Sequence, residues 1–354
     1  MFNRQLLKRA AVGFLLMLSA VGVVGFLYTI SERPNSVKNG FNRKMLPVRL
    51  TIVNAVKRDR NISNVIGYTA GHFYYQTGDA GVVAVSATNL DSFRYLTIDI
   101  ADKERIGSAF SGEVNYPYYY IYAGNMRCVI SADLTGRAAT QYYHTKDLFT
   151  RAVKVSPTAF MFRGIDTTYA KIDQVFIRQD TMRKAKTIKS FTQRRDDAGF
   201  STDGLLHYDT AGGRLLYLYF YSNQFICFDT GFNIIYTGNT IDTIKSVPGV
   251  ETITTKSRDI VSFSRPMPLI NAYNCIDGEY IYNYSTLQAD NESDTAFRGN
   301  SAIDMYSLKN GKYAGSLYIP AYDSEKIKFF KVYGNAVVAL YQHYIVVYKM
   351  NYDR

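Results

Sequence analysis

The residues with catalytic potential in this sequence are scattered and form no recognised motif. The 354 residues contain no HExxH, GxSxG, P-loop or CxxC pattern. The four histidines, His72, His144, His207 and His343, stand at unrelated positions without metal-ligand spacing. We therefore predict that each histidine is a strand or turn residue and that the protein uses no cofactor. The missing motifs weigh against an enzyme without excluding one.

The acidic segment that begins at Asp290 comes closest to a metal site. Asp290, Glu292 and Asp294 place carboxylates at alternate positions, as calcium loops do, because a hard cation needs several converging oxygens. Thr295 stands at the sixth position, where such a loop needs glycine, and Ser301 at the twelfth, where it needs a bidentate glutamate. The segment is therefore predicted to be a solvated loop, and no metal site is expected.

The three cysteines, Cys128, Cys227 and Cys275, each lie within an apolar strand pattern. This placement predicts buried free thiols. One disulfide in an oxidising compartment stays open as an alternative, because the odd number supports no framework of bridges.

The formal net charge is +11, and one stretch of the chain holds much of it. An exported domain rarely meets nucleic acid, so we expect no nucleic-acid partner and favour anionic headgroups or an acidic protein. The alternative is a solvated hairpin face. The basic residues of this stretch are Lys171, Arg178, Arg183, Lys184, Lys186, Lys189, Arg194 and Arg195, opposed by Asp173 and Asp180.

The N-terminus carries a candidate membrane anchor. Three basic residues precede an uncharged, mostly apolar run of 21 residues from Ala10 to Ile30. A bilayer core takes about 20 helical residues, whereas the apolar stretch of a cleaved signal peptide is about 7 to 15 long. We predict an uncleaved transmembrane helix at residues 1–30, with cleavage as the alternative. Flanking charges are balanced, so the body is placed on the extracytoplasmic, periplasmic side because long domains translocate largely regardless of charge. Residues 31–47, rich in Pro, Asn and Gly, are predicted to be a linker.

A hairpin pattern recurs after the linker. Successive hairpins begin at residues 82, 128, 175, 225, 303 and 344, and the intervals are 46, 47, 50, 78 and 41 residues. Tyrosine-rich strands precede most of them, such as Leu215 to Tyr221, in which both faces are apolar or aromatic. Strands buried on both faces and repeats of about 40 to 50 residues are typical of the four-stranded blades of a β-propeller.

The last unit runs out of chain before its fourth strand. Val48, Leu50 and Ile52 alternate with Arg49, Thr51 and Val53 in a strand that has no hairpin partner. Pairing residues 48–53 with Tyr344–Met350 would remove an exposed sheet edge. The sequence therefore predicts an all-β, six-bladed propeller over residues 48–354, closed by its N-terminal strand.

Hairpins of the form hydrophobic-x-hydrophobic-x-Asp-x-x-Gly, such as Ile226 to Gly231, give the chain a resemblance to six-bladed TolB-like or NHL-like propellers. The resemblance is one of architecture. Such propellers include lactonases, quinoprotein dehydrogenases, receptors and scaffolds, so the resemblance implies the fold and no particular activity.

Three elaborated loops are predicted to share one face of the propeller. The four strands of a blade form an antiparallel meander, so successive loops lie at alternate ends of the strands. The loop between the second and third strands therefore lies on the same face of the propeller as the loop that leads to the next blade. Loops on a rigid scaffold commonly carry function, so this face is the predicted binding surface. The alternative is that these loops have lengthened without acquiring a function. Its charged residues are Arg194, Arg195, Asp196, Asp197, Lys256, Arg258, Asp290, Asp294 and Arg298.

Two function classes follow. The first is a membrane-anchored, non-catalytic binding or scaffold module of an envelope complex, with a protein partner on the elaborated face. The second is a propeller enzyme of lactonase or quinoprotein type with a site in the central channel. Converging carboxylates, Asn and His in the channel would favour the enzyme, whereas Tyr and aliphatic residues would favour the scaffold.

Overall fold

The computed structural model of the chain describes residues 4–31, 38–59, 61–166, 173–182, 186–191, 199–245, 250–254, 259–263 and 269–352. It divides into two compact units, Met1–Lys38 and Asn39–Arg354. The first contains the helix α1 (Arg4–Ser31). Among the described residues, no helix combines the length and the apolar character needed to cross a bilayer. The predicted transmembrane helix is therefore not confirmed and stays a prediction.

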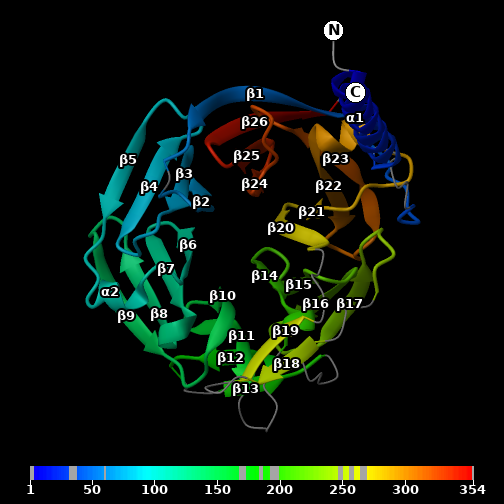
Figure 1. The fold of residues 1–354 in the computed structure, drawn as a ribbon. Helices are drawn as coiled ribbons and strands as arrows, with labels where there is room; N and C mark the ends of the chain where they lie inside the picture. Colours follow the sequence, from blue (N-terminus) through cyan, green and yellow to red (C-terminus); the bar gives the residue numbers. More distant parts are fainter. Residues whose placement is uncertain are drawn as a thin grey trace. The chain divides into compact units, whose positions relative to one another are not determined.

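The second unit is a ring of antiparallel sheets (Figure 1). In its described part, six sheets have four strands each, and consecutive strands of a sheet are hydrogen-bonded neighbours. This arrangement confirms the predicted six-bladed propeller. Blades 1 to 3 consist of β2 (Asn64–Thr69), β3 (His72–Gln76), β4 (Val82–Ala87) and β5 (Phe93–Thr97); β6 (Ser111–Asn115), β7 (Tyr118–Ala123), β8 (Cys128–Asp133) and β9 (Ala138–His144); and β10 (Phe149–Ser156), β11 (Ala159–Asp166), β12 (Asp173–Asp180) and β13 (Lys186–Lys189).

Blades 4 to 6 repeat the same meander, with one exception in the order of the chain. The fourth strand of blade 6 is the N-terminal strand β1. The blades consist of β14 (Gly204–Asp209), β15 (Arg214–Tyr219), β16 (Gln224–Asp229) and β17 (Ile234–Asn239); β20 (Asn271–Asp277), β21 (Tyr280–Ser285), β22 (Asn300–Ser307) and β23 (Tyr313–Pro320); and β24 (Phe329–Tyr333), β25 (Ala336–Leu340), β26 (Tyr344–Tyr352) and β1 (Val48–Lys57).

The closure of the ring agrees with the sequence prediction. Strand β1 pairs antiparallel with β26 from Val48 opposite Tyr352 to Lys57 opposite Tyr344, with a bulge between Ile52 and Asn54. The pairing joins the two ends of the propeller and covers the backbone edge of β26, which would otherwise be open to association.

The remaining elements are short and lie in connections. The long interval between blades 4 and 5 contains a separate hairpin of β18 (Val250–Thr254) and β19 (Asp259–Phe263). The connections also contain α2 (Lys103–Ile106), α3 (Asp294–Arg298), and the 3₁₀ turns η1 (Gly124–Met126) and η2 (Phe200–Thr202).

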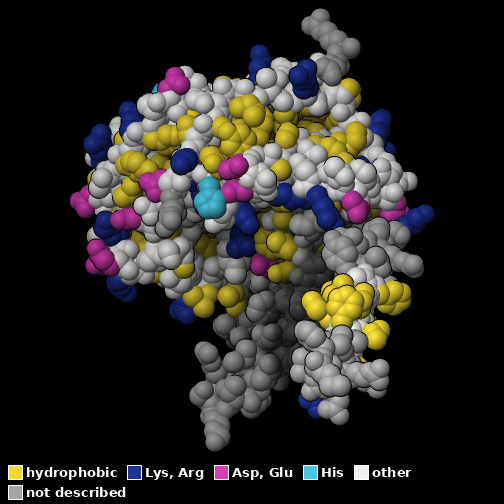
Figure 2. Space-filling view, turned by 45° about the horizontal axis from the view of Figure 1, so that its top comes forward, with side chains coloured by type: hydrophobic (Ala, Val, Ile, Leu, Met, Phe, Trp, Pro, Cys, Tyr) yellow, Lys and Arg dark blue, Asp and Glu magenta, His cyan; other side chains and the backbone are white. Residues whose placement is uncertain are grey.

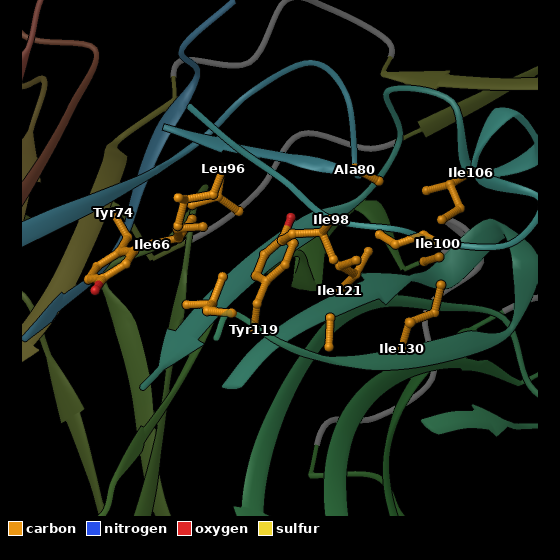
Figure 3. Packing of buried hydrophobic residues seen from close by; sticks show 14 of the residues in the cluster. Ile66, Tyr74, Ala80, Leu96, Ile98, Ile100, Ile106, Tyr119, Ile121 and Ile130 are labelled. Atoms are coloured by element: carbon orange, nitrogen blue, oxygen red, sulfur yellow. The ribbon is translucent and has the colours of Figure 1, made fainter. Parts of the chain in front are cut away.

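The core lies between the blades rather than at one centre. Each junction between neighbouring blades holds its own cluster of buried hydrophobic side chains. Figure 3 shows the junction of blades 1 and 2, where Ile66 and Leu96 meet Tyr119 and Ile121. Strand β15 shows why its sequence is apolar on both faces: Tyr217 packs toward blade 3, and Leu218 packs toward blade 5.

Candidate functional site

The innermost strands of the blades enclose a cavity along the central channel. Its volume is about 380 Å³, at the small end of the range for ligand pockets. Strands β2, β6, β10, β14, β20 and β24 all contribute to it. The lining consists of residues 64–68, 111–114, 151–153 and 205–208 together with Tyr122, Thr210, Ile276, Lys331 and Tyr333.

Lys331 is one of the two cations of this lining. On β24, Phe330 and Val332 are buried behind the strand, and Lys331 and Tyr333 line the channel. Its Nζ lies 5.8 Å from the ring centroid of Tyr273. Burial lowers the pKa of Lys331, but Tyr273, Cys275 and Tyr333, together with a side-chain hydrogen bond to Tyr273, raise it, so the pKa stands above its ordinary value. The direction of this shift and the nearby Tyr273 ring both favour the ammonium form.

Glu113 is the carboxylate of the channel lining. It lies on β6, and the Tyr122 hydroxyl donates a hydrogen bond of 2.5 Å to its Oε2. Burial raises the pKa of Glu113, although the Tyr122 hydrogen bond and the charges of Lys331 and Lys154 oppose the shift. The described ion pairs place no carboxylate within 4.0 Å of the Lys331 ammonium, so Glu113 does not neutralise it directly.

His207 contributes a neutral imidazole to the wall. On β14, its Nε2 lies 2.6 Å from Asn274 Oδ1, and because that oxygen accepts, Nε2 carries the proton. Burial lowers the pKa of His207 to about 3, and the positive charge of Lys331 acts in the same direction. The ring is therefore uncharged at any pH at which the protein is expected to work.

Arg151, the second cation of the lining, is already satisfied by the protein. Its Nε donates to Gly204 O at 3.0 Å and its Nη1 donates to Thr150 O at 2.8 Å. Its Nη2 lies 3.7 Å from Asp203 Oδ1. Arg151 thus fixes the junction of β10 and β14.

His207 and Cys275 are poorly suited to catalysis at neutral pH. A general acid or base works best when its pKa lies near the working pH, and that of His207 lies far below it. Burial raises the pKa of the neighbouring Cys275 thiol to about 11, so it is not an activated nucleophile. Among the residues that the structure describes, no three His, Cys, Asp or Glu side chains come together to hold a metal ion.

The structure describes three of the nine residues predicted to form the binding face. Asp290 accepts hydrogen bonds from the backbone N–H of Asn39 at 2.8 Å and of Gly40. Asp294 starts α3 and accepts a 3.0 Å hydrogen bond from Gln288 Nε2, and Arg298 lies in the last turn of the same helix. The other six, Arg194, Arg195, Asp196, Asp197, Lys256 and Arg258, lie outside the described residues.

The loop of Asp290 therefore holds the chain's own N-terminal segment. Arg43, predicted to be in a linker, is buried and reaches two carboxylates: its Nε donates to Asp304 Oδ1 at 2.8 Å and its Nη1 donates to Glu292 Oε2 at 2.5 Å. Residues 39–46 are thereby fixed to blade 5 just before β1. Sequence reasoning missed this ion cluster, because no local pattern links residues about 250 positions apart.

The predictions for histidine and cysteine agree with the structure. His72 begins β3, His144 ends β9, His207 lies within β14, and His343 lies in the turn before β26. The three cysteines are buried and free. The channel residues Glu113 and Lys331 were missed, although a lysine between Phe330 and Val332 is a signal that could have found one of them.

The basic charge of the chain is not gathered on the face visible in Figure 2. Lys and Arg side chains are interspersed there with Asp and Glu. Of the basic stretch noted in the sequence, Arg178, Lys186 and Lys189 lie in β12 and β13. Lys186 pairs with Asp147 at 2.6 Å, so part of this charge is compensated within the protein.

Comparisons with known proteins identify the architecture. No family model and no curated protein matches the chain. Among solved structures, a member of the duf4221 family from Bacteroides vulgatus has a TM-score of 0.52 at 11% identity, covering 88% of this chain and 100% of that one. A protein from Bacteroides fragilis proposed to be exported has a TM-score of 0.51 at 9% identity, covering 87% of this chain and 96% of that one. At such identities the likeness shows the fold alone. The resemblance to six-bladed propellers is thus confirmed as architecture, and its TolB-like or NHL-like refinement stays a prediction.

Proposed function

We propose that this chain is a non-catalytic binding module, a propeller held by its N-terminal helix at a membrane on the extracytoplasmic side. The observation that carries the proposal is the content of the central channel. It offers two cations, Lys331 and Arg151, one carboxylate that accepts a tyrosine hydrogen bond, and one neutral histidine among tyrosine and aliphatic side chains. Such a lining can recognise a ligand, but it lacks a matched acid and base.

The alternative of a lactonase or quinoprotein enzyme is weaker on the same ground. A hydrolytic metal site in a channel needs several oxygen ligands converging on one point. Glu113 is the carboxylate of the described lining. The charged groups that act on its pKa are Lys331 and Lys154. These neighbours favour an anion over a cation at this position.

Export and anchoring are supported by the N-terminus. The uncharged run from Ala10 to Ile30 follows basic residues, as in export signals. The likeness to the Bacteroides fragilis chain, which is itself proposed to be exported, is consistent with this location. We therefore propose a single-pass protein whose propeller faces the periplasm.

A protein partner on the elaborated loop face completes the proposal. Loops held by a rigid ring are suited to recognition, and mixed charge fixes the register of a protein contact. Because Asp290 holds the chain's own backbone, the contact is assigned to the other charged residues of the face, among them Arg194, Arg195 and Arg298.

The test is capture of a partner by the intact protein from membranes. Reversal of Arg194 and Arg195 to Glu should reduce co-purification, whereas reversal of Lys184 and Lys186, which belong to the same basic stretch of the sequence, should not. Surface substitutions usually shift stability by only about 0.5 kcal/mol, so a folding measurement serves as the control. Loss confined to the Lys184 and Lys186 variant would move the interface to the rim. Recovery of a soluble mature form beginning near residue 31 would overturn the anchor.

A further inference from the structure

We propose that the central channel is a binding site for a small organic monocarboxylate, whose carboxylate pairs with Lys331 and whose apolar or aromatic body packs against the channel's tyrosines. The site goes beyond the proposed partner contact, because it lies inside the ring and takes a small molecule.

Lys331 gives the channel a cation that can pair with an anion. Lys331 lines the cavity with no carboxylate of the described residues within ion-pair distance. A cation withdrawn from bulk water costs free energy unless a partner of opposite charge compensates it. Arg151 bonds to Gly204, Thr150 and Asp203. Lys331 contacts the neutral side chain of Tyr273, so it is the cation of the lining without an ion-pair partner among the described residues.

The surroundings of Lys331 favour one negative charge over two. Glu113 lies close enough for Lys331 to act on its ionisation, so a dianion such as phosphate would meet like charge. Phosphate sites also commonly use an arginine fork or the N–H groups of a helix N-terminus. The cavity is lined by strands, and its arginine is already bonded within the protein.

The rest of the wall suits an apolar body. Tyr68, Tyr208 and Tyr333 enter the lining together with Val153, Leu205 and Ile276. A volume of about 380 Å³ accommodates a ligand the size of a substituted benzoate. His207 is neutral, so it adds a polar wall without adding charge.

The experiment titrates the purified full-length protein with benzoate, with benzamide as the neutral isostere and with inorganic phosphate, by calorimetry and ligand-observed NMR. Benzoate should bind, and benzamide and phosphate should bind at least about tenfold more weakly, which corresponds to about 1.4 kcal/mol. Lys331→Met should weaken benzoate binding at least tenfold. The matched control is Lys328→Met, because Lys328 is exposed just before β24 and should leave binding unchanged.

Two further variants keep the proposal open to refutation if Lys331→Met folds poorly. Lys331→Arg keeps the charge and should retain binding. Glu113→Gln removes the like charge near the ligand and should tighten benzoate binding several-fold, which a merely structural glutamate would not do. Three results would each overturn the proposal. Benzamide could bind as tightly as benzoate, or phosphate could bind more tightly than benzoate. The third is benzoate binding that is unaffected by both Lys331→Met and Glu113→Gln.

Discussion

Replacing Arg43 by methionine should destabilise the propeller more than any surface change. The guanidinium is buried with Asp304 and Glu292, and Asp304 also accepts a 2.6 Å hydrogen bond from Ser316 Oγ. Methionine fills much of the same space but removes the only positive charge that the described ion pairs bring to these two carboxylates. Both would then be buried without a counter-ion.

The magnitude follows from the uncompensated charge. Breaking a buried pair by removing one partner costs about 3 to 5 kcal/mol. For a folded unit of this length, a loss of 1 kcal/mol lowers Tm by roughly 1.5 °C on the per-residue unfolding entropy, so the expected decrease is roughly 5 to 8 °C. The loss should also depend on pH. Burial already raises the pKa of Asp304, and removing Arg43 raises it further. A carboxyl group with a raised folded-state pKa binds protons more readily in the folded state, so the stability of the variant should increase as pH falls toward that pKa.

The assay is thermal and urea unfolding at neutral and mildly acidic pH, with Arg49→Met as the control because Arg49 is exposed on β1. Adding Asp304→Asn and Glu292→Gln to the Arg43 variant should restore part of the stability, because the stranded charges are removed. A loss below about 1 kcal/mol for Arg43→Met, or no recovery on neutralising the carboxylates, would refute the reasoning.

Three other predictions follow from the same geometry. Deleting residues 48–56 should expose β26 and cause aggregation, measured by size exclusion with light scattering; a monomer with unchanged melting would contradict the ring closure. The His207 imidazole should not titrate by NMR between about pH 5 and 8. Because its pKa in the folded state is lowered to about 3, its contribution to stability is present above its unfolded-state pKa and lost as pH falls, so His207→Gln should flatten the acid side of the stability profile. Gly124→Ala should lower the free energy of unfolding by about 1 to 3 kcal/mol, because the new Cβ would lie 1.9 Å from the carbonyl oxygen of Phe149. Gly78→Ala is the control, because Gly78 has open space around it and its replacement should cost less. Equal melting temperatures of the two variants would show that the backbone relaxes around Gly124.

The blades could be predicted from the sequence because their determinants are local. Strand β15 carries apolar residues on both of its faces, which predicted burial on two sides. Hairpins that recur mostly every 40 to 50 residues predicted a repeat of four strands. The pairing of strand β1 could also be predicted from the sequence. A strand without a neighbour along the chain needs a distant partner, and blade 6 lacked one strand.

The site depended on the tertiary structure, because its residues come from different blades. Lys331, Glu113 and His207 are separated by up to 218 positions in the sequence and meet only when the ring closes around the channel. Their pKa shifts arise from burial and from one another's charges, which no local pattern encodes. Arg43 is a second example. Its surrounding polar stretch predicts a linker, and only the tertiary structure places Asp304 and Glu292 beside it. Sequence by itself thus determined the repeating strands, whose burial follows residue periodicity, and tertiary structure decided which charges are buried together.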